Sequence, residues 1–441
     1  MVDFCIVGLG VSGLAAAKYC LRQGYSFSIT DSRDQPPGLE TVQALSPNTP
    51  FFLGGFSLDA MLDANEVIVS PGVSLKEPAL LEAKKQGKTL LGDLELFARV
   101  AKRPVVAITG SNGKTTVTSL IGEMARACGQ RVVVAGNIGT SVLDSLAQET
   151  LPDLYVLELS SFQLERIESL KLRVAVFLNL CEDHMDRYDS LADYAAAKQR
   201  IYQHAQICVY NREDPWTTPP AGKQTVSFAC DEPKEGEFGL IDHDDKTYLA
   251  KGTQRLMPSS RLFLEGRHHV ANALACLAAG DALGLDIATM LDVLRKFRGI
   301  RHRCEWVRLM QGVTWYNDSK GTNVGATLAA IQTLGEKTKG KLILIAGGQG
   351  KGADFSPLRP LVKRYVREVI LMGEVADQLE RLFADVVKTV RVNSMDEAVQ
   401  AAELAAVRGD SVLLSPACAS FDMFNNYEHR GDVFCESVKA L

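Results

Sequence analysis

Short apolar runs alternate with amphipathic segments along the whole chain. In the first ninety residues the apolar runs have the length of buried strands, and the segments between them carry apolar residues at helical spacing. The predicted strands are Phe4–Val7, Phe27–Thr30 and Val67–Ser70, and the predicted helices are Leu14–Arg22 and Pro78–Gln86. This order predicts a small βαβ domain, and the stretch DLELFARVAKRP predicts its exit helix and linker.

A second unit of the same kind begins with an apolar strand at Pro104–Thr109 and a helix from Lys114 to Cys128. Residues 213–265 are rich in Pro, Gly and Asp, which predicts a small β region of short strands. Two helices then complete the unit. The further predicted strands are Val132–Ala135, Leu154–Leu159, Val174–Leu178 and Ile207–Tyr210, and the predicted helices are Leu191–Gln203, His269–Leu283 and Ile287–Phe297.

The pattern starts again near Gly299, with strands separated by helical stretches. These strands are Thr314–Asn317, Lys341–Ala346, Glu368–Met372, Val387–Val392 and Ser411–Ser415. Alternation of strand and helix over the whole chain predicts an α/β protein of three domains. They are an N-terminal Rossmann-like nucleotide-binding domain (residues 1–93), a central P-loop mononucleotide-binding domain with a parallel sheet and a small β region (94–299), and a C-terminal Rossmann-like domain (300–441).

Composition narrows the class of function. Hydrophobic residues make up 46% of the 441, which excludes a disordered chain. The net charge of -5 disfavours a nucleic-acid-binding protein, and no apolar run reaches the roughly 18 residues of a membrane span. The ten cysteines are scattered with no pair at CxxC spacing, which indicates a reducing compartment. We therefore expect a cytoplasmic protein, most simply a monomer, that binds neither nucleic acid nor membrane.

The segment Ala107–Thr116 carries the sharpest motif of the chain. An apolar strand enters the turn TGSNG, and KTT opens the next helix. Backbone N–H groups that converge at a helix N-terminus bind phosphate, Lys114 would reach the β and γ phosphates, and the Thr115 hydroxyl would ligate Mg²⁺. The spacing is shorter than in the strict motif, so a surface loop that happens to read GKT is the alternative. The expected phosphate-binding residues are Gly110, Ser111, Asn112, Gly113, Lys114, Thr115 and Thr116.

A second glycine motif lies in the first domain. The sequence GLGVSG at residues 8–13 follows a strand and opens a helix, and Asp31 ends the next strand. This arrangement is typical of a nucleotide diphosphate site in which Asp31 binds a ribose hydroxyl. The run Ser70–Gly72 ends another strand and would face the same crevice. Glycines needed only for packing of the helix on the sheet remain the alternative.

Three polar residues in the central unit are candidates for chemistry. Glu158 lies near the end of an apolar strand, where a buried carboxylate needs a partner or a cation; a structural role is equally compatible. His184 follows the carboxyl end of another strand, where open α/β sheets bind their ligands, although a structural histidine is the commoner case. Lys198 lies on a predicted helix with no evident partner, and the residues alone predict a solvated lysine.

These segments together resemble the Mur ligases, the ATP-dependent amide ligases that build the peptide stem of bacterial cell-wall precursors. The resemblance covers essentially the whole chain. GLGVSG with DSR, and GGQGKGADFSPL, most resemble the members that add D-glutamate to UDP-N-acetylmuramoyl-L-alanine. The segments shared with the family are, in order, TGSNGKTT, the Glu158 strand, NLCEDHMDRY, Lys198, NDSKGTN and SPACASFD.

The resemblance implies a set of site residues. Lys114, Glu158, His184 and Lys198 would be catalytic, with Thr115, Glu158, His184 and a carbamylated Lys198 around two Mg²⁺ ions. Asn272, Arg303 and Asp318 would contact ATP. The UDP substrate would be held by Val11, Ser12, Asp31, Ser32, Arg33, Ser70, Gly72 and Asn137. D-glutamate would be held by Thr322, Lys351, Ser420 and Tyr427, the last mainly through its backbone.

One position departs from the family pattern, and several rival functions remain. The family reads H-N-x-x-N before Asn272, but this chain has His269 at the first asparagine, so no role is assigned to it.

Another Mur-type ligase or a folylpolyglutamate-type ligase is the close alternative, although the latter lacks a domain equivalent to residues 1–93. A NAD-dependent dehydrogenase would explain GLGVSG alone, and a P-loop switch NTPase would explain TGSNGKTT alone.

Overall fold

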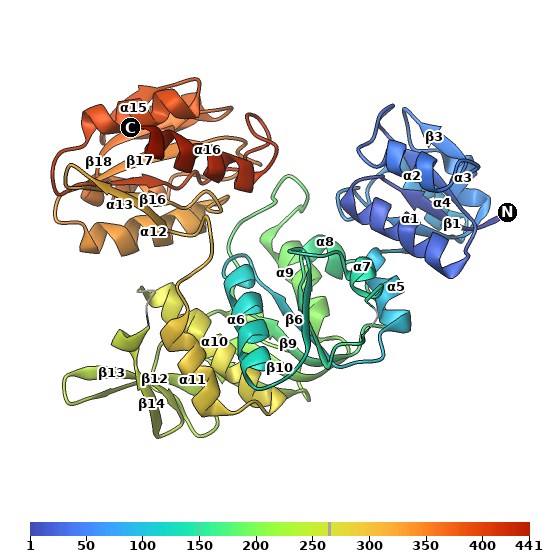
Figure 1. Cartoon of the computed structure of the whole chain (residues 1–441), viewed down its shortest axis with the longest axis horizontal. Coiled ribbons are helices and arrows are strands. Elements are labelled where there is room, and N and C mark those ends of the chain that lie inside the picture. The colour runs from blue at the N-terminus through green and yellow to red at the C-terminus, as the bar shows by residue number, and fades with distance from the viewer. Residues whose placement is uncertain (149, 263–265) are drawn as a thin grey trace. The chain divides into compact units, whose positions relative to one another are not determined.

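Three β-sheets organise the chain in the computed structural model, which describes residues 1–148, 150–262 and 266–441 (Figure 1). Helices connect the strands within each sheet, so the predicted α/β class is confirmed. The sheets have five, nine and six strands and follow one another along the chain. The residue boundaries given above for the domains stay predictions.

The first sheet is parallel, with strand order β3-β2-β1-β4-β5. Val7 pairs with both Thr30 and Val69, so three strands end level and their following loops share one edge. The first helix ends at Gly24, whose left-handed backbone (φ 73°) closes the last turn. The strands are β1 (Val2–Val7), β2 (Phe27–Asp31), β3 (Phe51–Leu53), β4 (Ala64–Val69) and β5 (Thr89–Leu91), and the helices are α1 (Val11–Gln23), α2 (Leu39–Leu45), α3 (Leu58–Leu62), α4 (Pro78–Lys85) and α5 (Asp93–Val100).

The second sheet has the order β14-β13-β12-β11-β10-β9-β6-β8-β7. The six strands β11, β10, β9, β6, β8 and β7 run parallel to one another. Strand β11 meets β12 through the single parallel pair Phe228–Phe238. The predicted β region is thus an extension of the central sheet rather than a separate piece; its residues 263–265 lie outside the described residues. The strands are β6 (Val105–Thr109), β7 (Val132–Gly136), β8 (Leu154–Glu158), β9 (Leu172–Phe177), β10 (Ala205–Asn211), β11 (Gln224–Phe228), β12 (Phe238–His243), β13 (Lys246–Lys251) and β14 (Gln254–Pro258).

The four predicted helices of the central region are present, whereas the short helices α7 and α8 were not predicted. The predicted helix at Leu191–Gln203 is an α-helix only as far as Gln199 and continues as one turn of 3₁₀-helix. The helices are α6 (Lys114–Ala127), α7 (Val142–Ser145), α8 (Ser161–Leu164), α9 (Leu191–Gln199), α10 (Arg267–Leu283) and α11 (Ile287–Lys296), with 3₁₀ turns at Arg200–Tyr202, Pro215–Thr217 and Ser259–Arg261.

The third sheet is covered by helices on both faces. Alternate residues of β17 enter two separate cores: Leu344 packs in the core with α12, α13 and α14, and Ile345 packs in the core with α15 and α16. The sheet order is β15-β16-β20-β17-β18-β19, with β15 antiparallel at one edge. The strands are β15 (Glu305–Met310), β16 (Val313–Asn317), β17 (Leu342–Gly347), β18 (Val366–Met372), β19 (Lys388–Arg391) and β20 (Ser411–Leu414), and the helices are α12 (Val324–Lys337), α13 (Leu358–Tyr365), α14 (Ala376–Phe383), α15 (Met395–Ala405) and α16 (Tyr427–Ala440).

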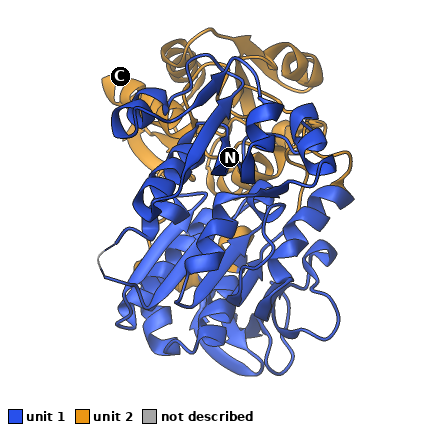
Figure 2. Ribbon diagram, turned by 90° about the vertical axis from the view of Figure 1, so that its right-hand side faces the viewer, with its two compact units in different colours: residues 1–179, 192–259, 271–295 blue, residues 180–191, 260–270, 296–441 orange. Residues whose placement is uncertain are grey.

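Contacts group the chain into two compact units (Figure 2). One comprises residues 1–179, 192–259 and 271–295, and the other comprises residues 180–191, 260–270 and 296–441. The loop that carries His184 therefore belongs to the second unit. No helix in the described part of the chain combines the length and apolar character needed to cross a membrane.

Candidate active site

The TGSNGKTT segment forms a loop between the end of β6 and the start of α6. Gly113 is the N-cap of α6 with φ 83°, and a Cβ there would lie 2.5 Å from Oδ1 of Asn272. Glycine is therefore required at Gly113 for two reasons, its left-handed backbone and the close approach of Asn272. The structure thus brings Asn272, a predicted ATP contact, against the predicted phosphate loop.

Asn179, at the carboxyl end of β9, fixes the conformation of this loop. Its carbonyl oxygen accepts from the N–H of Ser111 at 2.9 Å, and its Oδ1 accepts from the N–H of Asn112 at 2.9 Å. Its Nδ2 donates to the carbonyl oxygen of Asn112 at 3.1 Å. These three hydrogen bonds hold the loop open in the form of an anion-binding turn at a helix N-terminus.

Two lysine ammonium groups meet at one carbonyl oxygen of the loop. Lys114 Nζ donates to the carbonyl oxygens of Gly110 at 2.7 Å and Ser111 at 2.9 Å, and Lys198 Nζ donates to Gly110 at 2.9 Å. Lys198 is 1% exposed, so the expectation of a solvated lysine is wrong: α9 turns this side chain into the interior. Its ammonium also lies 4.6 Å from the centre of the Tyr194 ring, which partly offsets its desolvation.

Glu158 ends β8, the strand beside β6, and is 1% exposed. Its Oε1 accepts a hydrogen bond of 2.8 Å from Nδ2 of Asn137. Its Oε2 is buried and has no hydrogen-bond partner among the residues that the structure describes. An unsatisfied carboxylate oxygen in the interior is costly, and a divalent cation satisfies it. Glu158 therefore fits a Mg²⁺ ligand, and Asn137, expected at the muramoyl substrate, here orients that carboxylate.

The His184 loop is organised by its neighbour Asp183. His184 has φ 59°, and its N–H donates to Oδ1 of Asp183 at 2.9 Å. Lys351 Nζ also donates to this oxygen at 2.6 Å, and Asn323 Nδ2 donates to Oδ2 at 3.2 Å. No group of three His, Cys, Asp or Glu side chains capable of holding a metal exists within the described ranges. A metal site here would therefore need oxygen ligands from the substrate phosphates as well.

The first-domain glycine motif opens onto a cavity of about 520 Å³. Gly13 is essential to its shape, because a Cβ there would lie 1.9 Å from the carbonyl oxygen of Gly8. The predicted UDP-substrate residues of the first domain all line the cavity: Val11, Ser12, Asp31, Ser32, Arg33, Ser70 and Gly72. The glycines thus serve both packing and a binding cavity, so the two interpretations of GLGVSG are not exclusive.

Asp31 is the ionic centre of this cavity. Burial raises the pKa of its carboxyl, but hydrogen bonds from the Arg33 side chain and from the N–H of Leu9 outweigh burial, so the net pKa lies below its usual value. The distances are 2.9 and 2.8 Å from Arg33 Nε and Nη2, and 2.6 Å from the Leu9 N–H. Asp31 is therefore an anion at neutral pH, and its carboxylate is held rigid at the cavity wall.

Asp318 and Arg303, both predicted ATP contacts, lie together in the second unit. Desolvation raises the pKa of Asp318 to about 6, opposed by a hydrogen bond from Ser415 and by the nearby Arg303 charge. The Ser415 hydroxyl donates to Oδ2 of Asp318 at 2.7 Å, and the N–H of Cys304 donates to Oδ1 at 3.2 Å. This buried carboxyl is thus fixed in position at the end of β16.

Of the predicted D-glutamate residues, Thr322, Lys351 and Ser420 lie on loops, and Tyr427 begins α16, the helix that carries the buried guanidinium of Arg430. This side chain donates to the Ser319 Oγ at 2.9 Å and to the carbonyl oxygens of Cys418 and Ala419 at 3.2 Å. It therefore ties the loop before Thr322 to the loop that carries Ser420. Desolvation lowers the pKa of Arg430 to about 10, so it remains charged.

The remaining residues of this group have partners of their own. Lys351 binds Asp183, as described above, and Ser420 is buried, with its carbonyl oxygen accepting from the N–H of Phe424 at 2.8 Å. The backbone carbonyl of Tyr427 accepts from the Ser319 hydroxyl at 2.8 Å, and its phenol oxygen accepts from Lys320 at 3.0 Å. The Tyr427 backbone therefore supports the loop before Thr322.

Comparison with known proteins identifies the family. A model described as "Mur ligase middle domain" matches residues 108–280, "Mur ligase MurD-like, N-terminal domain" matches residues 3–92, and "Mur ligase, glutamate ligase domain" matches residues 302–418. The chain belongs to the Mur ligase family. The UDP-N-acetylmuramoylalanine--D-glutamate ligase of Coxiella burnetii is 52% identical over 99% of this chain and 98% of its own length. The ligase of the same name from Pseudomonas putida is 50% identical over 99% and 97%.

Solved structures of Mur ligases share the fold. The UDP-N-acetylmuramate-alanine ligase of Thermotoga maritima matches with a TM-score of 0.63 at 20% identity, covering 100% of both chains. MurF from Acinetobacter baumannii matches with a TM-score of 0.62 at 16% identity, covering 98% of this chain and 90% of its own. At these identities the match concerns the three-domain fold alone.

Sequence reasoning missed three residues that shape this Mur ligase site: Asn179, Asp183 and Arg430. Asn179 and Asp183 lie in the NLCEDH segment, which was singled out only for His184. A signal for Asn179 existed, because it directly follows the predicted strand that ends at Leu178, at the binding edge of the sheet. Nothing in the sequence separates Arg430 from the many exposed arginines, since only tertiary packing buries it.

Position 269 has no partner that would suggest a role. The His268 and His269 rings lie 3.9 Å apart, and Nδ1 of His269 is buried without a hydrogen-bond partner in the described part of the chain. Desolvation, together with the charges of Arg303 and Lys337, lowers the pKa of His268 to about 4. Desolvation, followed by the proximity of His268 and the same two charges, lowers the pKa of His269 well below its usual value. Both rings are therefore neutral at physiological pH.

Proposed function

We propose that this chain joins D-glutamate to UDP-N-acetylmuramoyl-L-alanine with hydrolysis of ATP to ADP and phosphate. One observation carries the choice of substrates: identity of about one half, over essentially the full length of both chains, to ligases named for this reaction. The alanyl carboxylate attacks the γ-phosphorus of ATP and ADP leaves, which gives an acyl phosphate. The amine of D-glutamate then attacks the acyl carbon, a tetrahedral intermediate forms, and phosphate leaves with loss of one proton.

The phosphate loop performs the first half of this reaction. Residues 110–116 would bind the phosphates of ATP through the Lys114 ammonium and those loop N–H groups that do not donate to Asn179, with Thr115 and Glu158 as oxygen ligands of Mg²⁺. Bound Mg²⁺ would supply positive charge that neutralises the two anions that must approach each other. The unsatisfied Oε2 of Glu158 supports this role, as does the position of Lys114 at the start of α6. His184 is proposed as a ligand of the second ion.

Lys198 is proposed to carry a carbamate formed from its neutral amine and CO₂, with release of one proton. Its position supports this, because the buried Lys198 and the partly buried Lys114 approach the same carbonyl oxygen and two cations there repel each other. A carbamate replaces one positive charge by a negative one that attracts Lys114 and offers two oxygen ligands to Mg²⁺.

The two other substrates take the sites described for each unit. The UDP part occupies the 520 Å³ cavity, where Asp31 accepts from a ribose hydroxyl and Arg33 faces the phosphates. The muramoyl part contacts Asn137. Asn272, Arg303 and Asp318 contact ATP, and D-glutamate is held by Thr322, Lys351, Ser420 and the Tyr427 backbone. Lys351, now paired with Asp183, supplies the positive charge for one carboxylate.

Phosphate release across candidate amino acids tests the proposal. With ATP, Mg²⁺ and UDP-N-acetylmuramoyl-L-alanine present, we expect release only with D-glutamate, and not with L-glutamate, L-lysine or meso-diaminopimelate. Mass spectrometry should find the product with one added glutamyl residue. Release without any amino acid, or equal rates with all four, contradicts the proposal.

We also propose that the protein works as a monomer in the cytoplasm. The ten cysteines support a reducing compartment, because none of them forms a disulfide within the described ranges. Sedimentation equilibrium of the purified chain tests the monomer, and a single species of about 48 kDa is expected.

A further inference from the structure

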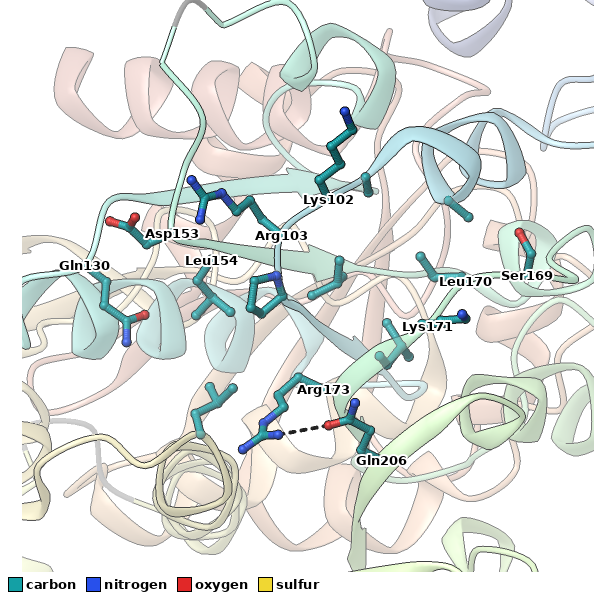
Figure 3. A pocket seen from close by; sticks show the side chains of 16 residues that line it. Lys102, Arg103, Gln130, Asp153, Leu154, Ser169, Leu170, Lys171, Arg173 and Gln206 are labelled. Atoms are coloured by element: carbon teal, nitrogen blue, oxygen red, sulfur yellow. Dashed lines mark hydrogen bonds between the residues drawn. The ribbon is translucent and has the colours of Figure 1, made fainter.

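A second cavity, of about 790 Å³, lies at the amino-terminal ends of the central parallel strands, whereas the phosphate loop follows the carboxyl end of β6 (Figure 3). It is lined by the first residues of three parallel strands: Val105 of β6, Leu154 of β8 and Leu172 of β9. The phosphate loop follows the other end of β6. The five residues of that strand separate the two sites by roughly 15 Å.

The cavity has a cationic rim. Lys102, Arg103, Lys171 and Arg173 line it, and Figure 3 shows Lys102 and Arg103 on one side of Leu154 and Arg173 on the other. Lys102 and Lys171 make no hydrogen bond or ion pair with any residue that the structure describes. In a chain of net charge -5, four cations around one cavity are a local excess whose mutual repulsion a bound anion would relieve.

The carboxylate on the rim does not supply that anion. Asp153 is paired with Arg131, whose Nε and Nη2 donate to it at 3.1 and 2.9 Å. These hydrogen bonds and, to a smaller extent, the charge of Arg103 lower the pKa of Asp153 to about 2, so Arg131, which lies outside the lining, is its main partner. The Oε1 of Gln206 accepts from Nη1 of Arg173 at 3.0 Å and thereby orients that guanidinium.

The floor of the cavity is apolar. Leu154, Leu170 and Leu172 form its base and are only 3–4% exposed, so the accessible apolar lining consists of the half-buried Leu283 and the exposed Pro104. The volume lies within the roughly 300–1,000 Å³ that small-molecule pockets occupy, and an apolar floor with a few fixed charges is their usual composition. A compact inorganic anion would use the rim and leave Leu283 and Pro104 uncovered.

We infer that this cavity binds a small organic anion with two or more negative charges and an apolar or aromatic body, such as a phosphate ester. The body would cover Leu283 and Pro104, and the negative charges would bind the four cations. Because Lys102 and Arg103 belong to the linker between α5 and β6, whereas Lys171 and Arg173 precede or begin β9, the ligand would join the linker to the central sheet.

Fluorescence titration with pyranine, a trisulfonated hydroxypyrene, tests the inference in the presence of saturating ADP and Mg²⁺, which occupy the phosphate loop. The wild-type chain should bind one equivalent. The double variant Lys102→Glu with Lys171→Glu should bind it at least tenfold more weakly. The matched control is Lys84→Glu with Lys85→Glu, on α4 of the first domain, which makes the same change of net charge on an exposed helix and should bind like wild type.

Competition then identifies the class of ligand. Phenyl phosphate should displace pyranine at a concentration at least tenfold lower than inorganic phosphate does. Equal displacement by the two, equal binding by wild type and the Lys102/Lys171 variant, or equal losses in both double variants overturns the inference. If the charge reversals impair folding, Arg103→Gln with Arg173→Gln is the substitute. Retention of D-glutamate-dependent phosphate release by the variants separates this result from a failure of the proposed reaction.

Discussion

Replacement of Asn179 by alanine should weaken ATP binding without loss of the fold. The side chain makes two hydrogen bonds with the backbone of Asn112, at 2.9 and 3.1 Å, and alanine removes both. The third bond, from the Ser111 N–H to the Asn179 carbonyl, involves only the backbone and remains. Each lost bond is worth about 1 kcal/mol net, so the phosphate-binding form of the loop loses about 2 kcal/mol relative to other conformations.

That free energy corresponds to a roughly thirtyfold weaker affinity for ATP. Isothermal titration with a non-hydrolysable ATP analogue measures it, and a parallel titration with UDP-N-acetylmuramoyl-L-alanine should be unchanged, because the first-domain cavity lies on another sheet. The thermal midpoint should fall by only a few degrees, since Asn179 is at a sheet edge and leaves no cavity in an apolar core.

Asn211→Ala is the matched control. Asn211 ends the neighbouring strand β10, and its side chain also makes two hydrogen bonds, with the Leu178 carbonyl at 3.2 Å and the Glu213 N–H at 3.0 Å, but none with the loop. It should retain wild-type affinity for ATP. If Asn179→Ala binds ATP as tightly as wild type, or if Asn211→Ala loses as much affinity, the loop is not held by Asn179 and the reasoning is wrong.

Three other outcomes are expected. Gly13→Ala places a Cβ 1.9 Å from the Gly8 carbonyl oxygen, so equilibrium titration should show at least a tenfold loss of affinity for the UDP substrate while ATP affinity is kept. Lys198→Ala should abolish phosphate release, and added acetate-like anions or chloride should restore part of it; wild-type turnover in this variant would contradict the carbamate. Burial raises the pKa of Asp318 to about 6 from 3.8, so the folded chain retains a proton that the unfolded chain releases between pH 4 and 6. The free energy of unfolding should therefore fall by about 3 kcal/mol as the pH rises from about 4 to 6. Denaturant titrations of Asp318→Asn should not show this fall. An identical pH profile in the wild type and the variant would show that Asp318 is not the group responsible.

The sequence by itself determined the order of elements and the two glycine loops. The buried parallel strands are continuous apolar runs such as LILIAG at Leu342–Gly347, and their composition alone indicates a strand covered on both faces. The edge strands β7 and β19 were predicted, but β15 was not, because it carries exposed Trp306 and Leu309 beside polar residues and no buried run marks it. The motif at Gly110–Lys114 was readable because phosphate binding by backbone amides requires glycines at fixed local spacing.

Only the tertiary structure decided the state of side chains whose partners are distant in sequence. The residues alone predicted a solvated Lys198, and only the family resemblance placed it in the site. In the structure the side chain is buried, and its ammonium donates to the carbonyl oxygen of Gly110, which lies 88 residues earlier in the sequence. Arg430 and Asp183 became visible for the same reason, since their partners lie on other loops. Local patterns report which face of a segment is apolar, whereas the pairing of a buried charge depends on which segments meet, and that is fixed by the fold as a whole.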